Sequence, residues 1–384
     1  YVIPVTDIDA VAELCQKEKV DGIITSFSDL LMECMVKIAE KAGLPCYLKP
    51  EQLPWYRDKS ETRALLRKLE LPTPGFRKIP TAVLEDPDRK PRLKERLKGL
   101  RYPVVSKPLD KYGSRGIYIS ENLDELIEAS QKTAEFSDMP EILVEEYNDG
   151  YEFNMMTWVL DGQVHVISIA DREKTSVAKG EIPISTRNVY PSRLMAKVER
   201  PATELLQAYI EKTGQKDGAL SMQFFWKPGE GIQVCEIAAR FFGYEHELTD
   251  IVYGFNMEEL LLASLYDRTK LQKMLTDHDI HKPHCCGAVI YFQGRLLTIG
   301  DQSKAVRLGQ KKEVEKPWIF YREGETVIEH GPNPYLALYY VKTENREEMD
   351  ELTQEFYREM HILDPSGKEV AYQNQIPDYT PAEK

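Results

Sequence analysis

The sequence lacks the features of membrane proteins and of disulfide-stabilised proteins. No stretch approaches the roughly 20 consecutive apolar residues that a membrane-spanning helix needs, and no secretory signal peptide is visible. The six cysteines are scattered and none forms a CxxC pair, which excludes a dense disulfide framework. We therefore expect a cytoplasmic protein with reduced thiols. The adjacent Cys285 and Cys286 are compatible either with a redox pair or with the start of a strand.

An excess of positive charge is also missing. The chain has 50 Lys and Arg residues against 63 Asp and Glu residues, and its net charge is −13. Phosphate backbones and anionic lipids recruit clustered Lys and Arg, so we expect no nucleic acid and no membrane among the partners. A nucleotide is not excluded, because it needs only a local basic pocket. We interpret the charged run over residues 86–101 as a solvated connection or surface helix.

The first 50 residues have no glycine-rich first turn, and Tyr1 stands where an initiating methionine would. Apolar runs at 1–5, 22–25 and 45–48 alternate with helical patterns that start near Asp7 and Asp29. This βαβαβ order predicts an α/β domain with a parallel sheet. The pattern begins abruptly, which suggests that an N-terminal portion of this domain is absent from the numbered chain.

The remainder of the chain predicts paired strands with interspersed helices. Asp161-Gly162 joins two apolar segments and is a strong hairpin signal, and residues 228–231 join two further segments. Helices are predicted over 58–68, 121–132, 201–212 and 346–361, and strands over 102–108, 117–119, 141–146, 153–160, 164–170, 219–226 and 232–238. A single core stops growing near about 250–300 residues, so 384 residues allow more than one lobe.

Three segments carry residues suited to chemistry on a nucleotide. The first is the loop from Lys107 to Gly116, which contains Gly113, Ser114 and Arg115. It lies between two predicted strands, which excludes a Walker A or Rossmann turn because both need a helix N-terminus. Its backbone N–H groups and the Ser114 hydroxyl can donate to phosphate oxygens. The alternative is a structural hairpin without a ligand.

The second segment is the strand that ends in Glu145, Glu146 and Tyr147, with Glu152 beyond it. Such a strand end can present backbone amides to an adenine edge. In this interpretation Glu145 accepts from the adenine amino group and Glu152 from ribose hydroxyls. The alternative is a solvated strand end.

The third segment is a predicted hairpin that carries Gln223 and Glu236, with Arg240 beyond its end. A carboxylate and an amide oxygen suit Mg²⁺, which also takes phosphate oxygens and water. Arg240 is placed to stabilise charge on a transferring phosphoryl group. The alternative is a structural ion pair between Glu236 and Arg240.

The order and spacing of these segments resemble the ATP-grasp superfamily from about Asp21 to Leu265. The resemblance rests on Asp21-Gly22-Ile23-Ile24-Thr25, Lys41-Ala42-Gly43-Leu44-Pro45, Asp58-Lys59, Gly113-Ser114-Arg115-Gly116, Glu145-Glu146-Tyr147 and Glu236-Ile237-Ala238-Ala239-Arg240. It implies an ATP site formed by Lys59, Lys107, Gly113, Ser114, Arg115, Gly116, Glu145, Glu146, Tyr147 and Glu152. It further implies that Gln223 and Glu236 ligate Mg²⁺, or Mn²⁺, and that Arg240 and Lys107 are catalytic.

Two positions depart from the family's usual pattern. Ala238 stands where the motif has an Asn that is often a second metal ligand, and Gln223 replaces an acidic ligand. Gln at this place is similar to carbamoyl phosphate synthetases, and the Glu-x-Ala-Ala-Arg form is similar to bacterial L-amino-acid ligases. The departures therefore resemble a subgroup variant, although Ala238 leaves a second Mg²⁺ less well held by protein.

The resemblance implies an ATP-grasp fold with α+β lobes, preceded by part of a Rossmann-like domain. The implied boundaries are 1–55 for the partial pre-ATP-grasp domain, 56–100 for a linker and entry helix, 101–150 for the lid, and 151–384 for the central and C-terminal subdomain.

The implied activity is that of an ADP-forming carboxylate–amine ligase, with a small-molecule carboxylate and an amine as substrates and a possible homodimer. Arg187 is the candidate for holding a substrate carboxylate, and Tyr190 and His246 are candidates for lining the same pocket. Two alternatives stay open. One is phosphorylation of bicarbonate or carbamate, as in carbamoyl phosphate synthetases, and the other is a nucleotide-binding protein without turnover.

Overall fold

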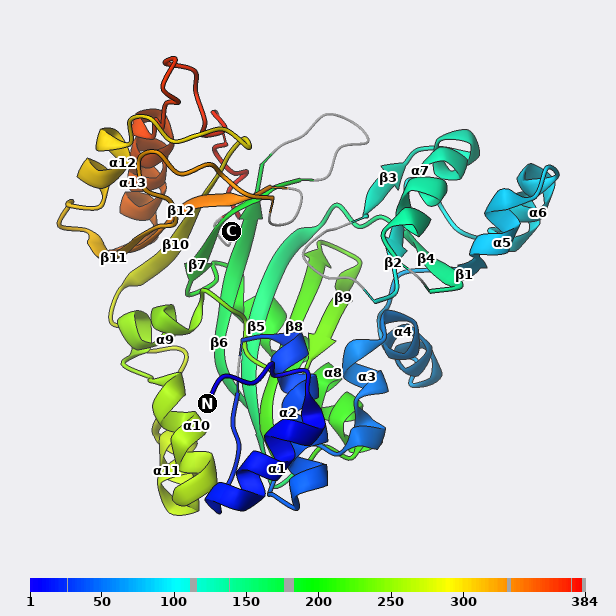
Figure 1. Cartoon of the computed structure of the whole chain (residues 1–384), viewed down its shortest axis with the longest axis horizontal. Coiled ribbons are helices and arrows are strands. Elements are labelled where there is room, and N and C mark those ends of the chain that lie inside the picture. The colour runs from blue at the N-terminus through cyan, green and yellow to red at the C-terminus, as the bar shows by residue number, and fades with distance from the viewer. Residues whose placement is uncertain are drawn as a thin grey trace. The chain divides into compact units, whose positions relative to one another are not determined.

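The computed structural model describes residues 1–25, 27–110, 116–137, 139–175, 183–329, 333–373 and 375–381 (Figure 1). The chain divides into two compact units, each assembled from segments that are distant in sequence. Unit 1 comprises Tyr1–Thr73, Glu152–Ala170 and Leu194–His284, and unit 2 comprises Pro74–Tyr151, Asp171–Arg193 and Cys285–Lys384. Within the described ranges no helix is both long and apolar enough to cross a membrane.

Unit 1 is built on antiparallel strands. β8 (Gly218–Lys227) pairs with β9 (Gly231–Ala238) and also neighbours β5 (Tyr151–Leu160), which is followed by the first part of β6 (Gln163–Lys174). Asp161 and Gly162 join β5 to β6 with φ values of 52° and 76°, as the predicted hairpin turn requires. The helices of this unit are α1 (Ile8–Glu18), α2 (Asp29–Ala42), α3 (Pro54–Arg57), α4 (Lys59–Lys68), α8 (Met195–Thr213), α9 (His246–Tyr253), α10 (Met257–Tyr266) and α11 (Arg268–Asp277), with a 3₁₀ turn at Pro50–Gln52.

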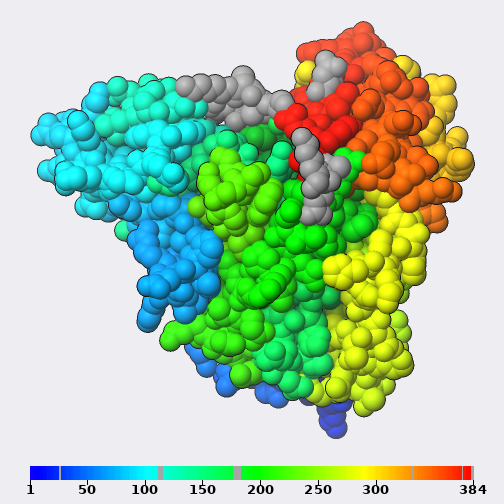
Figure 2. Space-filling view, turned by 180° about the vertical axis from the view of Figure 1, so that it is seen from behind, coloured from blue at the N-terminus to red at the C-terminus, as the bar shows by residue number. Residues whose placement is uncertain are grey.

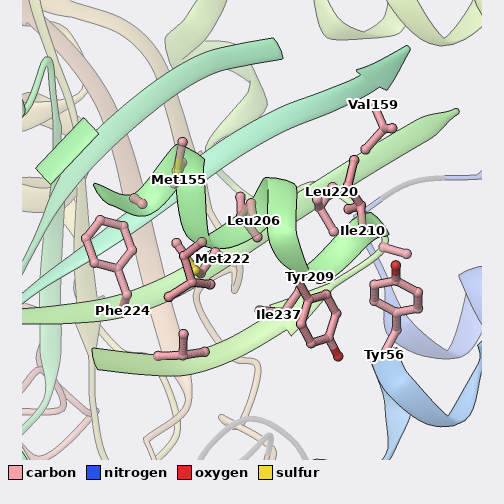
Figure 3. Close-up of a cluster of buried hydrophobic side chains, with 14 of the residues drawn as sticks. Tyr56, Met155, Val159, Leu206, Tyr209, Ile210, Leu220, Met222, Phe224 and Ile237 are labelled. Carbon is pink, nitrogen blue, oxygen red and sulfur yellow. The ribbon is translucent and has the colours of Figure 1, made fainter. Parts of the chain in front are cut away.

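An apolar core fills the space between α8 and one face of these strands. Met222 and Phe224, two residues apart on β8, point toward helically spaced apolar side chains of α8 (Figure 3). Successive side chains of a strand point to opposite faces, so the neighbouring Gln223 faces away from this core. The same alternation turns Glu236 of β9 to that opposite face.

The first 50 residues form the two predicted helices but not the predicted parallel sheet. α1 begins where the Asp7 side chain accepts a hydrogen bond from the Ala10 amide, and α2 begins at the Ser28 cap. The described residues of 1–5, 22–25 and 45–48 contain no strand, so that prediction is wrong for this segment. Ile23 instead packs into the core without strand pairing. A short apolar run specifies burial but not a hydrogen-bonding neighbour, and without a neighbour no strand forms.

The N-terminal part of unit 2 is a four-stranded antiparallel sheet in the order β1-β4-β2-β3. Its strands are β1 (Phe76–Pro80), β4 (Glu141–Glu146), β2 (Val104–Pro108) and β3 (Tyr118–Ser120), and its helices are α5 (Thr81–Glu85), α6 (Arg89–Arg96) and α7 (Leu123–Glu135). Leu93 on α6 is buried among apolar side chains, whereas most of the charged run around it is exposed. The interpretation of residues 86–101 as a surface helix is therefore confirmed.

The C-terminal part of unit 2 contains β7 (Ser185–Tyr190), β10 (Cys286–Gln293), β12 (Tyr335–Thr343) and β11 (Val314–Ile319), paired in this order, with α12 (Ser303–Leu308) and α13 (Arg346–Glu359). β7 also pairs with the end of β6. Near the end of the described chain, which is red in Figure 2, Pro377 forms an isolated antiparallel bridge with Thr175.

All six cysteines are free, and Cys286 opens β10. Burial raises the pKa of Cys286 to about 11. A thiol with so high a pKa is a poor nucleophile, which favours the strand-start interpretation of Cys285 and Cys286 over a redox pair.

Candidate active site

Three polar side chains meet on the face of the unit 1 sheet that points away from α8. Gln223 on β8 lies directly opposite Glu236 on β9 in the strand register. The Gln223 side-chain amide donates a hydrogen bond to the Glu152 carboxylate on β5, the strand beside β8. A β-bulge follows this pair, at the step from Gln223 to Phe224. The hairpin thus brings together two residues predicted as metal ligands, and Glu152 lies next to them.

This group of side chains fits a hard divalent cation. Carboxylate and amide oxygens are the protein ligands that Mg²⁺ takes, together with water and phosphate oxygens. Among the described residues no cluster of three or more His, Cys, Asp or Glu side chains is arranged to hold a metal. A cation bound at Glu236 and Gln223 would therefore depend on water or a phosphate-bearing ligand for the rest of its coordination.

Arg240 lies just beyond the end of β9 and is held by Asp29, the first residue of α2. Its Nε donates to Asp29 Oδ1 at 3.0 Å, and its Nη2 donates to Asp29 Oδ2 at 2.8 Å. The two side chains are only 11% and 10% exposed. A bidentate pair of this kind fixes the plane of the guanidinium as well as its position.

Electrostatics keep both members of this pair charged. Burial alone raises the pKa of Asp29, but the Arg240 guanidinium, helped by Arg57 and Lys59, more than offsets it and leaves that pKa below its usual range. Burial likewise lowers the pKa of Arg240, whereas Asp29, Glu236 and Glu245 raise it above its usual range.

The guanidinium of Arg240 retains N–H donors for which the described part of the chain offers no acceptor. A guanidinium has five N–H donors. The described residues accept three hydrogen bonds from Arg240, two at Asp29 and one at the Phe241 carbonyl oxygen at 3.3 Å. The remaining donors are chemically suited to an oxyanion such as a phosphoryl group.

The backbone around Arg240 is also fixed. The Tyr47 hydroxyl donates to the Ala239 carbonyl oxygen at 2.9 Å. Ala238 is 2% exposed and offers only a methyl group where the resembling motif has a side-chain ligand. On β5, two residues after Glu152, Asn154 donates to Glu245 at 2.7 Å.

Lys59 and His246 also belong to unit 1. Lys59 is the first residue of α4, directly after the Asp58 cap, and it lies near enough to Asp29 to lower its pKa. His246 opens α9 and stacks on the Phe27 ring at a centroid distance of 4.1 Å. Its Nε2 lies 3.1 Å from a Glu258 carboxylate oxygen.

In unit 2, Lys107 and Glu145 form an ion pair across the four-stranded sheet. Lys107 Nζ donates to Glu145 Oε2 at 2.6 Å, and the Glu145 carboxylate is buried. The sequence places both residues at the nucleotide, with Glu145 accepting from adenine. The structure shows that this Glu145 oxygen already accepts from Lys107.

Glu146 and Tyr147 use their backbone amides within unit 2. The Glu146 amide donates to the Gly75 carbonyl oxygen and the Tyr147 amide to the Pro103 carbonyl oxygen, each at 2.9 Å. The Glu146 carboxylate accepts from the backbone and side chain of Arg101. Both amides thus have acceptors within the protein, and an adenine contact at Glu146 and Tyr147 stays a prediction.

Of the predicted phosphate loop, Gly113, Ser114 and Arg115 lie outside the described residues. Gly116 has φ +67°, and a Cβ there would meet the Phe136 side chain at 2.8–2.9 Å. Glycine is thus required at 116 by local packing as well as by backbone conformation.

Arg187 and Tyr190, the candidate substrate residues on β7, are fully buried in unit 2. The Arg187 guanidinium donates to Glu173 at 2.5 Å, to Thr353 at 2.6 Å, to Asp350, and to the Met349 carbonyl oxygen at 3.4 Å. Arg187 already has carboxylate partners from the protein, so we leave it and Tyr190 out of the proposed substrate site.

Comparison with known proteins agrees with this architecture. A family model described as an ATP-grasp domain matches residues 100–247. A phosphoribosylamine–glycine ligase from Methanopyrus kandleri is 26% identical over 186 residues, which cover 46% of this chain and 39% of the relative. The matched segments span less than half the length of the curated relatives.

Solved structures show the same fold over nearly the whole chain. An L-amino acid ligase from Bacillus licheniformis superposes with a TM-score of 0.77 at 22% identity, covering 94% of this chain and 86% of that one. A phosphoribosylglycinamide synthetase from Anaerococcus prevotii gives a TM-score of 0.65 at 17% identity, covering 95% and 88%. These comparisons confirm the predicted ATP-grasp fold with its α+β lobes.

Proposed function

Because the chain carries an ATP-grasp domain over residues 100–247, we propose that it is an ATP-dependent ligase that activates a carboxylate as an acyl phosphate and couples it to an amine. The products are an amide, ADP and phosphate. The substrates are an amino acid or another small carboxylate, and an amine.

The observation that carries this proposal is the polar face of the unit 1 sheet. Gln223 and Glu236 lie opposite each other, and Glu152 contacts Gln223. Arg240 lies just beyond the end of β9, and some of its N–H donors have no acceptor among the described residues. Metal ligands beside a fixed arginine are the parts that phosphoryl transfer requires, because the protein contributes mainly positioning and charge stabilisation.

Gln223 and Glu236 would hold Mg²⁺, which supplies charge neutralisation at the phosphates when bound. A substrate carboxylate oxygen forms a bond to the γ-phosphorus, the bond to the β-phosphate oxygen breaks, and ADP leaves. Arg240 donates to the oxygens of the transferred group. Lys59 and Lys107 are assigned by resemblance to the phosphates as well.

The amine nitrogen then attacks the acyl carbon, the C–O bond to phosphate breaks, and the nitrogen loses a proton. Water competes with the amine for the acyl phosphate.

The test is ADP release from Mg-ATP in the presence of pooled amino acids and small carboxylates. The wild type should release ADP only with certain pools. Glu236→Ala should release at least about 100-fold less, because a metal ligand is lost. Glu230→Ala is the matched control, since Glu230 lies at the exposed turn of the same hairpin and should leave ADP release unchanged.

Two outcomes would favour other functions. ADP release that depends on bicarbonate alone would favour a carbamoyl-phosphate-synthetase-like reaction. Binding of Mg-ATP without ADP release from any pool would favour a nucleotide-binding protein, the alternative motivated by Ala238.

A further inference from the structure

Helix α2 supplies two acidic side chains, one turn apart, and each holds an arginine from a different part of unit 1. Asp29 pairs with Arg240, which is 211 residues away in sequence, and Glu33 pairs with Arg57 at 2.9 Å. Only the first of these arginines belongs to the proposed active site. We propose that Asp29 is a positioning residue that sets the orientation of Arg240 for phosphoryl transfer. This inference rests on the proposed function.

The hydrogen-bond geometry supports a positioning role. Asp29 engages Nε and Nη2, which form one edge of the guanidinium plane. With this edge fixed, rotation about the last side-chain bonds of Arg240 is blocked, and the unused donors point in a fixed direction. A bidentate contact of this kind restricts the orientation of a group more than a single hydrogen bond does.

The surrounding charges explain why this position needs a carboxylate. Arg240 is also attracted by Glu236 and Glu245, since both raise its pKa. Without Asp29, the guanidinium would turn toward these carboxylates, and Glu236 is the proposed metal ligand. Asp29 therefore keeps the phosphoryl-binding cation and the metal-binding carboxylate available as separate groups.

A purely structural role accounts for the carboxylate at position 29 less well than a positioning role does. Helix α2 already has a capping residue, because the Ser28 hydroxyl accepts from the Leu31 amide. The Glu33–Arg57 pair also ties the same helix to the region before α4. An uncharged residue at position 29 would leave both of these contacts in place.

The experiment compares wild type, Asp29→Asn, Arg240→Lys, the double variant, and Glu33→Gln as the matched control. ADP release is measured as kcat and KM for ATP, and the thermal midpoint of each variant is recorded. Asp29→Asn should lower kcat about 10- to 100-fold, since small misplacement of a catalytic group has effects of this size. KM for ATP should change less than about threefold, because nucleotide binding has other contacts.

The double variant should be no slower than Arg240→Lys alone, because Asp29 acts through Arg240. Glu33→Gln should stay within about twofold of the wild-type kcat. An Asp29→Asn kcat within twofold of wild type would overturn the proposal. Effects of the two substitutions that multiply in the double variant would also overturn it.

Failure of the proposed function is recognised separately. If wild type releases no ADP with any pool, the ligase proposal fails, and the orientation of Arg240 is then read from NMR hydrogen exchange of its Nε–H. The positioning proposal expects slow exchange in wild type and in Glu33→Gln, and fast exchange in Asp29→Asn. Equal exchange in all three proteins would overturn it independently of catalysis.

Discussion

Two arginines, one in each unit, are held by carboxylates in different ways. In unit 2, four of the five N–H donors of Arg187 have acceptors from the described protein, and the Tyr379 ring lies 4.2 Å from its Cζ. In unit 1, Arg240 has three such acceptors and faces further carboxylates at Glu236 and Glu245. An arginine with nearly all of its donors engaged stabilises structure, whereas an arginine with more spare donors is better equipped to bind an anion.

The environment of Arg187 extends this contrast. Arg346 on α13 donates to Asp171 at 2.8 Å and to Glu173 at 2.5 Å. Glu173 also accepts from the Thr380 amide at 2.6 Å. The carboxylates and arginines of unit 2 thus satisfy one another and fasten the end of the described chain.

The largest effect is expected from breaking the ion pairs around Arg187 in unit 2. Arg187→Met should lower the free energy of unfolding by about 3–5 kcal/mol, because it leaves the buried Glu173 and the partly buried Asp350 with less compensating charge. Urea denaturation measures this change. Arg240→Lys keeps a cation beside Asp29 and should cost far less stability, so equal losses in the two variants would contradict the distinction between them.

A second prediction makes the same substitution, Glu to Gln, near Arg240 in unit 1 and beside Arg187 in unit 2. Glu236→Gln should reduce ADP release by about 100-fold with little loss of stability, because the proposed metal ligand loses its charge. Glu173→Gln should instead destabilise the fold, because two arginines lose a buried carboxylate. Parallel activity and urea-denaturation measurements test this, and an unstable Glu236→Gln variant would assign Glu236 a structural role.

The smallest expected effect concerns pH. The pKa of Asp29 in the folded protein lies below its ordinary value of 3.8, so its ion pair contributes stability that is complete above that value. The contribution is lost as pH falls through the lower folded pKa. The stability advantage of wild type over Asp29→Asn should therefore be constant from pH 7 to 5 and shrink below about pH 3.8. An advantage that is unchanged at pH 3 would show that the charge of Asp29 does not stabilise the fold.

The sequence predicts the hairpins and helices around the site because these are local patterns. Asp161-Gly162 specifies a tight turn, and alternation along 219–226 and 232–238 places Gln223 and Glu236 on one face. The helix predicted over 58–68 forms as α4, with Asp58 as its cap. The predicted parallel sheet fails because the apolar runs near Ile23 and Cys46 pack without strand partners.

The partners of the arginines are not predictable in the same way. Asp29 is 211 residues from Arg240, and Asp350 is 163 residues from Arg187. No local sequence feature shows whether Arg187 belongs to a buried ion-pair network or binds a substrate, because either role places a charged residue on a strand. Asp29 carries one weak local signal, an acidic residue just after a Ser cap, and that signal indicates a helix start rather than a partner.

The most direct test of the ligase mechanism follows the oxygen of the substrate carboxylate. With the carboxylate that the pooled assay selects, labelled with ¹⁸O, the reaction should transfer one labelled oxygen to inorganic phosphate. ³¹P NMR would show the isotope shift on phosphate and would show ADP as the nucleotide product. Label in AMP, with pyrophosphate released, would contradict the acyl phosphate mechanism.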